Sequence, residues 1–262
     1  MNDSDSIFGI MASLGHVYYS VKVLIVLCDV LGISENSVRT NLHRMVKKGI
    51  LDSKKDGKKA FYYFGSKGIK ISRNVAQGFF TPDWKKWDNQ WVGIIYSIPE
   101  NQKTLRHKVR KKLELYRFAS LYPGFWMRPC QEKLPVNLDD IVSREYCDTI
   151  IFKPERSFSV QKIQELWNIK EIHREMIEAL SLINKEIKII TSATPEEAFK
   201  RKIIMGEKMV STLFKDPLLP DQFLPKDWSA ARLRKSFFEF DSLASKRSET
   251  LINKIIVEEG ND

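Results

Sequence analysis

The sequence predicts an α+β protein, because amphipathic helices and short β-branched strands both occur along its 262 residues and their order changes along the chain. Residues 1–80 combine helical periodicity with a hairpin signal. Strands and helices alternate over residues 81–160. From 161 to 262 the apolar spacing is that of helices. These three stretches are the predicted domains.

Two helices joined by a short turn are predicted near the N-terminus. From Ser20 to Leu31 the apolar residues recur every three or four positions, and Gly32 ends the helix. Ser34 is a suitable N-cap for the next helix. The apolar stripe of that helix is Val38, Leu42, Met45 and Val46. Helix, glycine-containing turn and helix are typical of a helix-turn-helix.

The second of these helices carries hydrogen-bonding and basic side chains opposite its apolar stripe. None of them is acidic, whereas a helix that only faces water would mix in acidic residues to gain i, i+4 pairs. A helix in the major groove of DNA requires such a face. We therefore predict a recognition helix that contacts DNA through Ser37, Arg39, Thr40, Asn41, His43, Arg44, Lys47 and Lys48.

A lysine-rich β-hairpin is predicted directly after this helix. Asp56-Gly57 separates two strand-like runs, and this dipeptide favours a type I′ turn, which needs positive φ at both central positions. As a wing, the hairpin would lie over the sugar-phosphate backbone, with Lys54, Lys55, Lys58 and Lys59 as electrostatic anchors. The alternative is an edge hairpin that its lysines protect from strand pairing. The whole segment predicts a winged helix-turn-helix.

Positive charge is concentrated in the first half of the chain. The formal net charge is +10, and counting Lys and Arg against Asp and Glu gives 12 − 6 = +6 for residues 1–80, 10 − 4 = +6 for 81–130 and 21 − 23 = −2 for the remainder. Basic surface attracts phosphate backbones, so a polyanionic partner is the hypothesis. A solvated, lysine-rich surface is the alternative.

Several function classes lack support in the sequence. The apolar runs are too short to span a membrane and the acidic N-terminus lacks the features of a secretory signal, so a cytoplasmic protein is expected. There is no metal-binding spacing of histidines and no nucleotide-binding or nucleophile motif. No cofactor, metal or catalytic residue is expected. The cysteines, which form no CxxC pair, are expected to be reduced: Cys28, Cys130 and Cys147.

Several motifs together resemble the PaaX-type repressors of phenylacetic acid degradation. The helix-turn-helix stretch over residues 31–51 resembles theirs. It is joined by further motifs in the family's order, which span nearly the whole chain: Trp87, Trp91 and Val92-Gly93; Leu121-Tyr122-Pro123-Gly124-Phe125-Trp126-Met127-Arg128-Pro129; Asp216-Pro217-Leu218-Leu219-Pro220; and Phe223-Leu224-Pro225-Lys226-Asp227-Trp228.

The resemblance implies a homodimeric repressor of a catabolic operon. Its two recognition helices would enter successive major grooves of a pseudo-palindromic, double-stranded operator, and an acyl-CoA effector such as phenylacetyl-CoA would release the DNA. Two departures from the family pattern occur. The segment Gly15 to Ser20 is shorter, and the basic pair before the Asp-Pro motif is replaced by Lys208 and Lys215. The second departure leaves the identity of the effector open.

The middle part predicts a ferredoxin-like α/β domain. Strands are expected at Trp91–Ile98, Phe125–Arg128 and Thr149–Phe152, and helices at Thr104–Tyr116 and Leu138–Glu145. By the resemblance, this domain is similar to small CRISPR-associated nucleases, which place an acidic metal ligand at the end of the first strand. Here that end reads Tyr96-Ser97-Ile98, so a dimerisation or scaffold role is expected. A metal-dependent nuclease is the alternative function.

The last part predicts helices over Val160–Lys188, Pro195–Phe214 and Ser229–Leu243. The prolines of Asp216–Pro220 must end the helix before them, and a rigid corner is the favoured interpretation of this motif. An acyl-CoA site would need aromatic walls and a basic group for the phosphates. The candidates for that site are Trp126 and Arg128, with packing in the core as the alternative.

Overall fold

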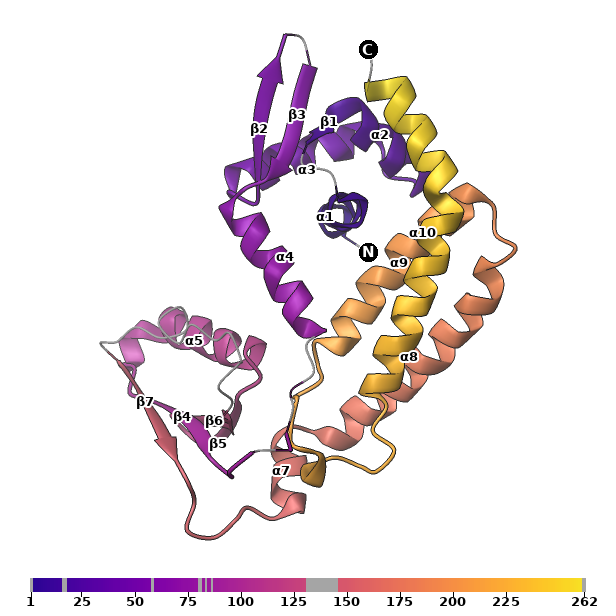
Figure 1. The fold of residues 1–262 in the computed structure, drawn as a ribbon. Helices are drawn as coiled ribbons and strands as arrows, with labels where there is room; N and C mark the ends of the chain where they lie inside the picture. The colour runs from indigo at the N-terminus through magenta and orange to yellow at the C-terminus, as the bar shows by residue number, and fades with distance from the viewer. Residues whose placement is uncertain are drawn as a thin grey trace. The chain divides into compact units, whose positions relative to one another are not determined.

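The computed structural model describes residues 2–15, 18–57, 59–79, 82, 84–85, 87–130 and 146–260. Helices and two small sheets make up the chain, which confirms the α+β class (Figure 1). Two compact units are present. The first unit comprises Met1–Phe79, Glu178–Leu213 and Ala231–Asp262, and the second comprises Phe80–Ile177 and Phe214–Ala230. No helix in the described part of the chain is long and apolar enough to cross a membrane.

The N-terminal part of the first unit contains the two predicted helices and the predicted hairpin. Its three strands form an antiparallel sheet in the order β1-β3-β2. The elements are α1 (Asp3–Leu14), β1 (Tyr19–Ser20), α2 (Val21–Val30), α3 (Glu35–Lys47), β2 (Leu51–Asp56), β3 (Lys59–Phe64) and α4 (Ser66–Gly78).

Local side-chain chemistry sets the ends of α2 and α3. The Ser20 hydroxyl accepts a hydrogen bond from the backbone N–H of Val23 at 3.2 Å, and the Ser34 hydroxyl accepts one from that of Ser37 at 3.3 Å. Gly32, which lies in the turn between the two helices, has a φ of 76°. Residues other than glycine adopt this backbone conformation only at a cost in free energy. The predicted N-cap and the predicted glycine turn are therefore present.

The hairpin turns one residue later than predicted. Asp56 pairs with Lys59 in the β2–β3 ladder, so Asp56 lies in the strand and the connection begins at Gly57, whose φ is 56°. Continuing the ladder by one residue pair keeps the backbone groups of Asp56 hydrogen-bonded. The tip is still built on the glycine, because that residue supplies the positive φ.

The C-terminal helices of the first unit differ from the prediction in length. They are α9 (Pro195–Leu213), α10 (Ala230–Gly260) and the part of α8 (Ile169–Ile190) that follows Ile177. A reciprocal pair of hydrogen bonds between Thr194 and Glu197 caps the start of α9. The predicted end of α10 near Leu243 is wrong. The helix continues because its last turns bury apolar side chains against the N-terminal helices: Leu251, Ile252, Ile255 and Ile256.

One hydrophobic core joins the N-terminal and C-terminal helices of the first unit. Ile7, Ile10 and Met11 of α1 are at most 1% exposed. The same cluster contains Leu24, Leu27, Leu42, Phe199, Ile203 and Ile255, which come from α2, α3, α9 and α10. Figure 1 shows α1 along its axis, with these helices around it. α1 therefore fixes the position of α3 within this unit.

The second unit contains a four-stranded antiparallel sheet in the order β5-β6-β4-β7. Helix α5 packs on one face through Val109 and Leu113. The other face packs against α7 and the segment around Phe223. The elements are β4 (Trp91–Tyr96), α5 (Lys103–Leu115), β5 (Ala119–Tyr122), β6 (Phe125–Pro129), β7 (Cys147–Phe152) and α7 (Val160–Leu166), with 3-10 turns at Glu100–Gln102 and Asp221–Phe223.

Three features of this unit differ from, or lie beyond, the sequence prediction. Strand β5 was not predicted. The single helix expected from Val160 to Lys188 is two helices, α7 and α8, because Asn168 between them has a φ of 50°. That conformation interrupts the helical hydrogen bonds. The predicted helix at Leu138–Glu145 lies outside the described residues.

A substitution in α10 tests whether the core of the first unit is shared. Ile255 is 5% exposed in that core, so Ile255→Ala should lower the free energy of unfolding by about 2–5 kcal/mol. Val257, on the same helix, is 60% exposed, and Val257→Ala should change it by less than about 0.5 kcal/mol. Urea unfolding followed by far-UV circular dichroism measures both. Equal effects would mean that the end of α10 does not belong to the core.

Candidate nucleic-acid interface

Helix α3 presents a continuous exposed stripe of polar side chains. Its members recur at i, i+4, i+7 and i+11, so they share one face of the helix, and Arg39 and Arg44 flank them. The inner face is buried, with Val38 and Leu42 at 0% exposure and Met45 at 3%. The exposed stripe consists of Asn36, Thr40, His43 and Lys47. The predicted outward positions 39, 40, 43, 44, 47 and 48 are all exposed.

Two predicted contact residues lie on the flank of α3 that faces α1. Asn41 is only 6% exposed, and its side-chain oxygen accepts a hydrogen bond from the Ser4 hydroxyl at 2.7 Å. The Ser37 hydroxyl donates to the Asp3 carboxylate at 2.5 Å. Placing Ser37 and Asn41 on the outward face was therefore wrong, because their polar groups satisfy the N-terminal turn of α1.

Asn36 is the exposed residue that the sequence interpretation omitted. It lies in the first turn of α3, on the same face as Thr40 and His43. A helical wheel centred on the buried Val38, Leu42 and Met45 would have included it. The N-terminal residues of a recognition helix are those that contact base edges, so Asn36 belongs to the candidate interface.

The two arginines on α3 differ in their surroundings. The Arg39 guanidinium forms an ion pair with Glu35, with Nη2 and Oε1 2.8 Å apart, so α3 does carry one i, i+4 pair with an acidic residue. The two side chains are 54% and 59% exposed, and a pair this open contributes at most about 1 kcal/mol. Arg44 has no ion pair with any residue that the structure describes. Its guanidinium is therefore available without breaking a contact.

The hairpin adds basic side chains near the end of α3. Lys54 and Lys55 are exposed on β2, and Lys59 is half-buried on β3. Lys58, the fourth predicted anchor, lies outside the described residues.

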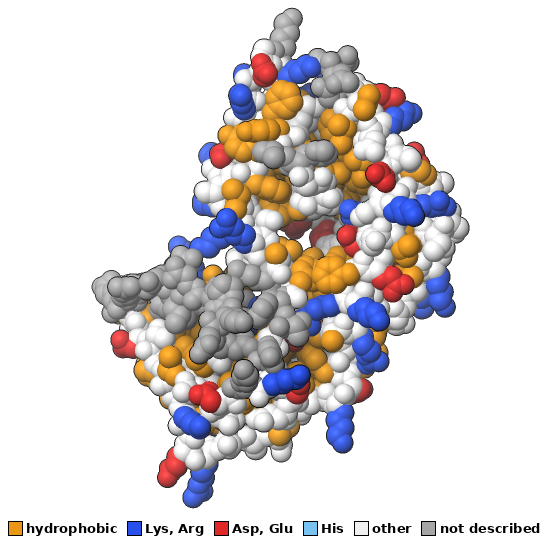
Figure 2. Space-filling view, viewed as in Figure 1, with side chains coloured by type: hydrophobic (Ala, Val, Ile, Leu, Met, Phe, Trp, Pro, Cys, Tyr) orange, Lys and Arg blue, Asp and Glu red, His pale blue; other side chains and the backbone are white. Residues whose placement is uncertain are grey.

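Basic side chains are not confined to the hairpin. On the face in Figure 2, Lys and Arg side chains occur over both units, among acidic ones. The hairpin differs from the other basic regions in that its lysines lie on a projecting pair of strands, and not in the number of its lysines.

The predicted ligand pair Trp126 and Arg128 belongs to the core of the second unit. Trp126 is 8% exposed and packs in the cluster under α5. Arg128 is 6% exposed, donates from Nη1 to the Tyr116 carbonyl oxygen at 2.9 Å, and lies over the Phe118 ring. Burial, and secondarily the charge of Arg117, lower the pKa of Arg128 to about 9. Both side chains are used in packing, which is the alternative that the sequence also offered, and their contact with an effector stays a prediction.

The Asp-Pro motif forms a structural corner. Asp216 is 2% exposed, and its carboxylate accepts the backbone N–H of Leu218 at 3.1 Å, while Leu218 itself has a φ of 52°. Arg117 donates to the Asp216 carbonyl oxygen at 2.7 Å. The motif that follows is also structural, since Phe223 and Trp228 pack with the core around Trp91. These contacts give both motifs a structural role in the second unit.

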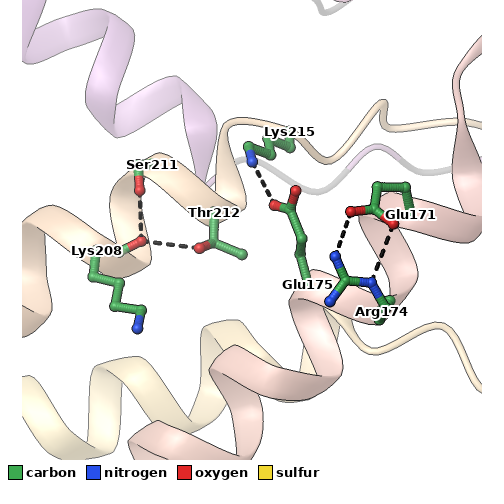
Figure 3. A network of polar contacts seen from close by, with 7 residues as sticks. All are labelled: Glu171, Arg174, Glu175, Lys208, Ser211, Thr212 and Lys215. Atoms are coloured by element: carbon green, nitrogen blue, oxygen red, sulfur yellow. Dashed lines mark hydrogen bonds and ion pairs between the residues drawn. The ribbon is translucent and has the colours of Figure 1, made fainter.

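The two lysines that replace the family's basic pair have different roles. The Lys215 ammonium forms an ion pair with Glu175, and beside it Arg174 pairs with Glu171 (Figure 3). Lys208, in the first unit, is exposed and makes no ion pair within the described part of the chain. Its carbonyl oxygen accepts hydrogen bonds from the Ser211 and Thr212 hydroxyls on the same helix.

The described residues offer no catalytic metal centre. No group of three or more His, Cys, Asp or Glu side chains among them could hold a metal ion. At the end of β4 the Ser97 backbone N–H donates to the Tyr146 carbonyl oxygen, and no carboxylate occupies this position. Cys28, Cys130 and Cys147 form no disulfide. Burial raises the pKa of Cys28 to about 12 and that of Cys147 to about 11, so neither is a nucleophile near neutral pH.

Comparison with known protein families matches three successive segments of the chain. Residues 6–68 match the family described as PaaX-like protein, residues 84–151 match the PaaX protein central Cas2-like domain, and residues 165–254 match the PaaX-like protein C-terminal domain. The segments cover the fold from α1 to α10. The chain therefore belongs to the PaaX family, and the resemblance inferred from its motifs is confirmed. It is a transcriptional regulator of this type.

Two individual proteins are similar over most of the chain. The transcriptional repressor PaaX of Escherichia coli (strain K12) is 26% identical over 224 residues, which cover 81% of this chain and 70% of the relative. The structure of the uncharacterized protein Rv0674 from Mycobacterium tuberculosis superposes with a TM-score of 0.60 at 23% identity, and the match covers 92% of this chain and 95% of that one. The second likeness shows a shared fold.

Proposed function

We propose that the chain is a repressor that binds double-stranded operator DNA through a winged helix-turn-helix. In this proposal α2 and α3 are the helix-turn-helix, the outer stripe of α3 enters the major groove, and the β2–β3 hairpin is the wing. The observation that carries the proposal is the exposed stripe of α3, which has no large apolar side chain, on a helix whose inner face is held in a core. A rigid helix with such a face fits a groove about 12 Å wide.

The electrostatics of the interface support the same assignment. Arg39, Arg44 and Lys47 carry positive charge along the edges and the end of the stripe, while Thr40 and His43 in its centre can hydrogen-bond base edges. Lys54 and Lys55 of the wing are exposed and would contact phosphates, which would fix the register of α3 without reading sequence. The sole acidic neighbour on α3, Glu35, is neutralised by Arg39. Repulsion of the phosphate backbone is thereby reduced.

We also propose that the chain forms a dimer and responds to an effector. The dimer is argued from the sheet of the second unit, and the effector from the family resemblance. The strand order and the antiparallel pairing of the second unit suit a ferredoxin-like sheet, which we propose serves as a scaffold for dimerisation. A two-fold dimer would match a pseudo-palindromic operator of the catabolic operon it represses. The acyl-CoA effector rests on the resemblance to the PaaX-type repressors of phenylacetic acid degradation. The burial of Trp126 and Arg128 gives no support for them as its contacts.

Removal of one arginine tests the recognition helix. Arg44→Ala should weaken operator binding by about tenfold or more, because a bidentate contact to a base or phosphate contributes about 1–3 kcal/mol. Arg247→Ala, which removes an exposed arginine of α10 in the same unit, is the matched control and should leave binding unchanged. Fluorescence anisotropy, with a duplex selected from a random pool by the wild-type chain, measures both. Equal affinities for the two variants would refute the assignment of α3.

The wing can be tested through the salt dependence of DNA binding, because the affinity that phosphate contacts contribute falls as the salt concentration rises. Each neutralised phosphate adds about 0.9 to the slope of log affinity against log salt, so the pair Lys54→Ala and Lys55→Ala should reduce the slope by about 2. Sequence preference should remain as in the wild type. The control pair, Lys185→Ala and Lys188→Ala on α8, should keep the wild-type slope. A reduced preference with an unchanged slope would contradict the wing assignment.

Oligomeric state and effector response can be read in one titration. Light scattering of the operator complex should give the mass of two chains on one duplex. Phenylacetyl-CoA added to the complex should then release the DNA, while free coenzyme A should not, because only a ligand with different affinities for the two states shifts their populations. A single chain per duplex would remove the dimer from the proposal, and indifference to the thioester would remove the effector.

A further inference from the structure

The first unit contains a cavity of about 600 Å³ directly behind the recognition helix. Its walls come from α1, α4, α9 and α10, and α3 contributes Met45, with Ile50 just beyond that helix. The volume lies within the range of small-molecule binding sites. The cavity shares no residue with the outer stripe of α3.

Most of the wall is apolar and aromatic. Phe79 stacks on Phe237, with ring centroids 5.6 Å apart, and lies 5.4 Å from the Phe238 ring. Phe8 of α1 and Ile71 of α4 add to this surface. Phe238 is 54% exposed, which is unusual for a phenylalanine and leaves its ring accessible to a ligand. An occupant would therefore need an apolar body.

Four charged side chains line the same cavity, three of them acidic: Asp5 on α1, Lys202 and Glu207 on α9, and Asp241 on α10. None forms a side-chain hydrogen bond or ion pair with another residue that the structure describes. Glu207 Oε2 is buried without a partner, and burial first and then the charge of Asp5 raise the pKa of this carboxyl, against the charge of the N-terminal amine, which lowers it. A carboxylate oxygen that is buried without a cation or donor is unfavourable, so an added cation would stabilise this side of the cavity.

The hydroxyl groups of the cavity do not supply the missing partners. The Ser4 hydroxyl donates to Asn41, that of Ser13 donates to the Ile10 carbonyl oxygen, and that of Ser211 donates to the Lys208 carbonyl oxygen. Lys202 is 8% exposed and is the one cation of the lining. Three carboxyls against one ammonium leave a formal excess of two negative charges when all are ionised.

We propose that this cavity binds a lipophilic amine, whose apolar body lies among the phenylalanine rings and whose ammonium group pairs with the carboxylates of Asp5, Glu207 and Asp241. Aromatic faces attract cations as well as apolar groups, so both parts of the wall favour this class. A carboxylate ligand would have Lys202 as its one partner and three groups of like charge around it. A CoA thioester, which carries several phosphate charges, is disfavoured more strongly, so the cavity is separate from any acyl-CoA site.

Occupancy of this cavity also bears on DNA binding, a consequence that rests on the proposed function. Met45 is 3% exposed on the inner face of α3, and a ligand that touches it contacts the helix that presents Thr40 and His43. A ligand that favours one position of α3 changes the affinity for the operator, and by linkage the operator changes the affinity for the ligand by the same factor. We expect this factor to be about fivefold or more.

Isothermal titration of the full chain, without DNA, tests the site and its ligand class. The probes are 4-(4-biphenylyl)butylamine, the matched butanoate and the matched butanol. The amine should bind one molecule per chain and at least about tenfold more tightly than either analogue, as expected for a charge-assisted contact. Its affinity should rise with pH through the raised pKa of Glu207, because the cation binds the carboxylate form. Equal or tighter binding of the butanoate would overturn the proposal.

Two variants locate the binding. Glu207→Gln should weaken amine binding about tenfold, whereas Glu196→Gln, an exposed change on the same helix, should not. A Cβ at Gly206 meets no atom within 4 Å, so Gly206→Leu can fill the cavity without a backbone clash and should abolish binding with no loss of thermal stability. Binding that survives Gly206→Leu would contradict the site. Since no DNA is present, this failure is distinct from failure of Arg44→Ala, which concerns the recognition helix.

Discussion

The burial of α1 is the constraint on which the first unit depends. Ile7, Ile10 and Met11 lose nearly all contact with water, and they do so against helices from both ends of the chain. At roughly 1.5–3 kcal/mol for each buried side chain, this helix contributes a large share of the stability of a marginally stable domain. Because α3 packs on α1, the same burial determines which face of α3 remains exposed. The proposed interface with DNA therefore depends on the core behind it.

The polar contacts of α1 refine that orientation. Hydrogen bonds from Ser4 to Asn41 and from Ser37 to Asp3 fix one flank of α3, while its outer stripe stays free. The cavity behind α3 has the opposite character, since its apolar wall is interrupted by carboxyl groups without partners. The inner flank of α3 is well packed, whereas the cavity beside it is not filled. This arrangement would let a small ligand in the cavity shift α3 without unfolding it.

Local signals in the sequence predicted the N-terminal elements well. Ser20, Gly32 and Ser34 mark the helix ends through contacts within four residues, and such contacts can be read without the fold. The errors arose where the deciding partner is distant. Asn41 is buried by a residue 37 positions away, and α10 continues to Gly260 because the N-terminal core covers its last turns. For Arg128, periodicity gave the correct strand but could not tell a ligand from the Tyr116 carbonyl oxygen.

Whether the outer stripe of α3 touches nucleobases can be measured by site-specific photo-crosslinking. A p-benzoylphenylalanine replacing His43 should crosslink to bases of a selected duplex on irradiation. The same group replacing Val257, which is exposed on α10, is the control. Its crosslink yield with the selected duplex should not exceed its yield with a duplex of mixed sequence. Mass spectrometry of the adducts identifies the attached nucleotides. Crosslinks from position 257 and none from position 43 would contradict the account.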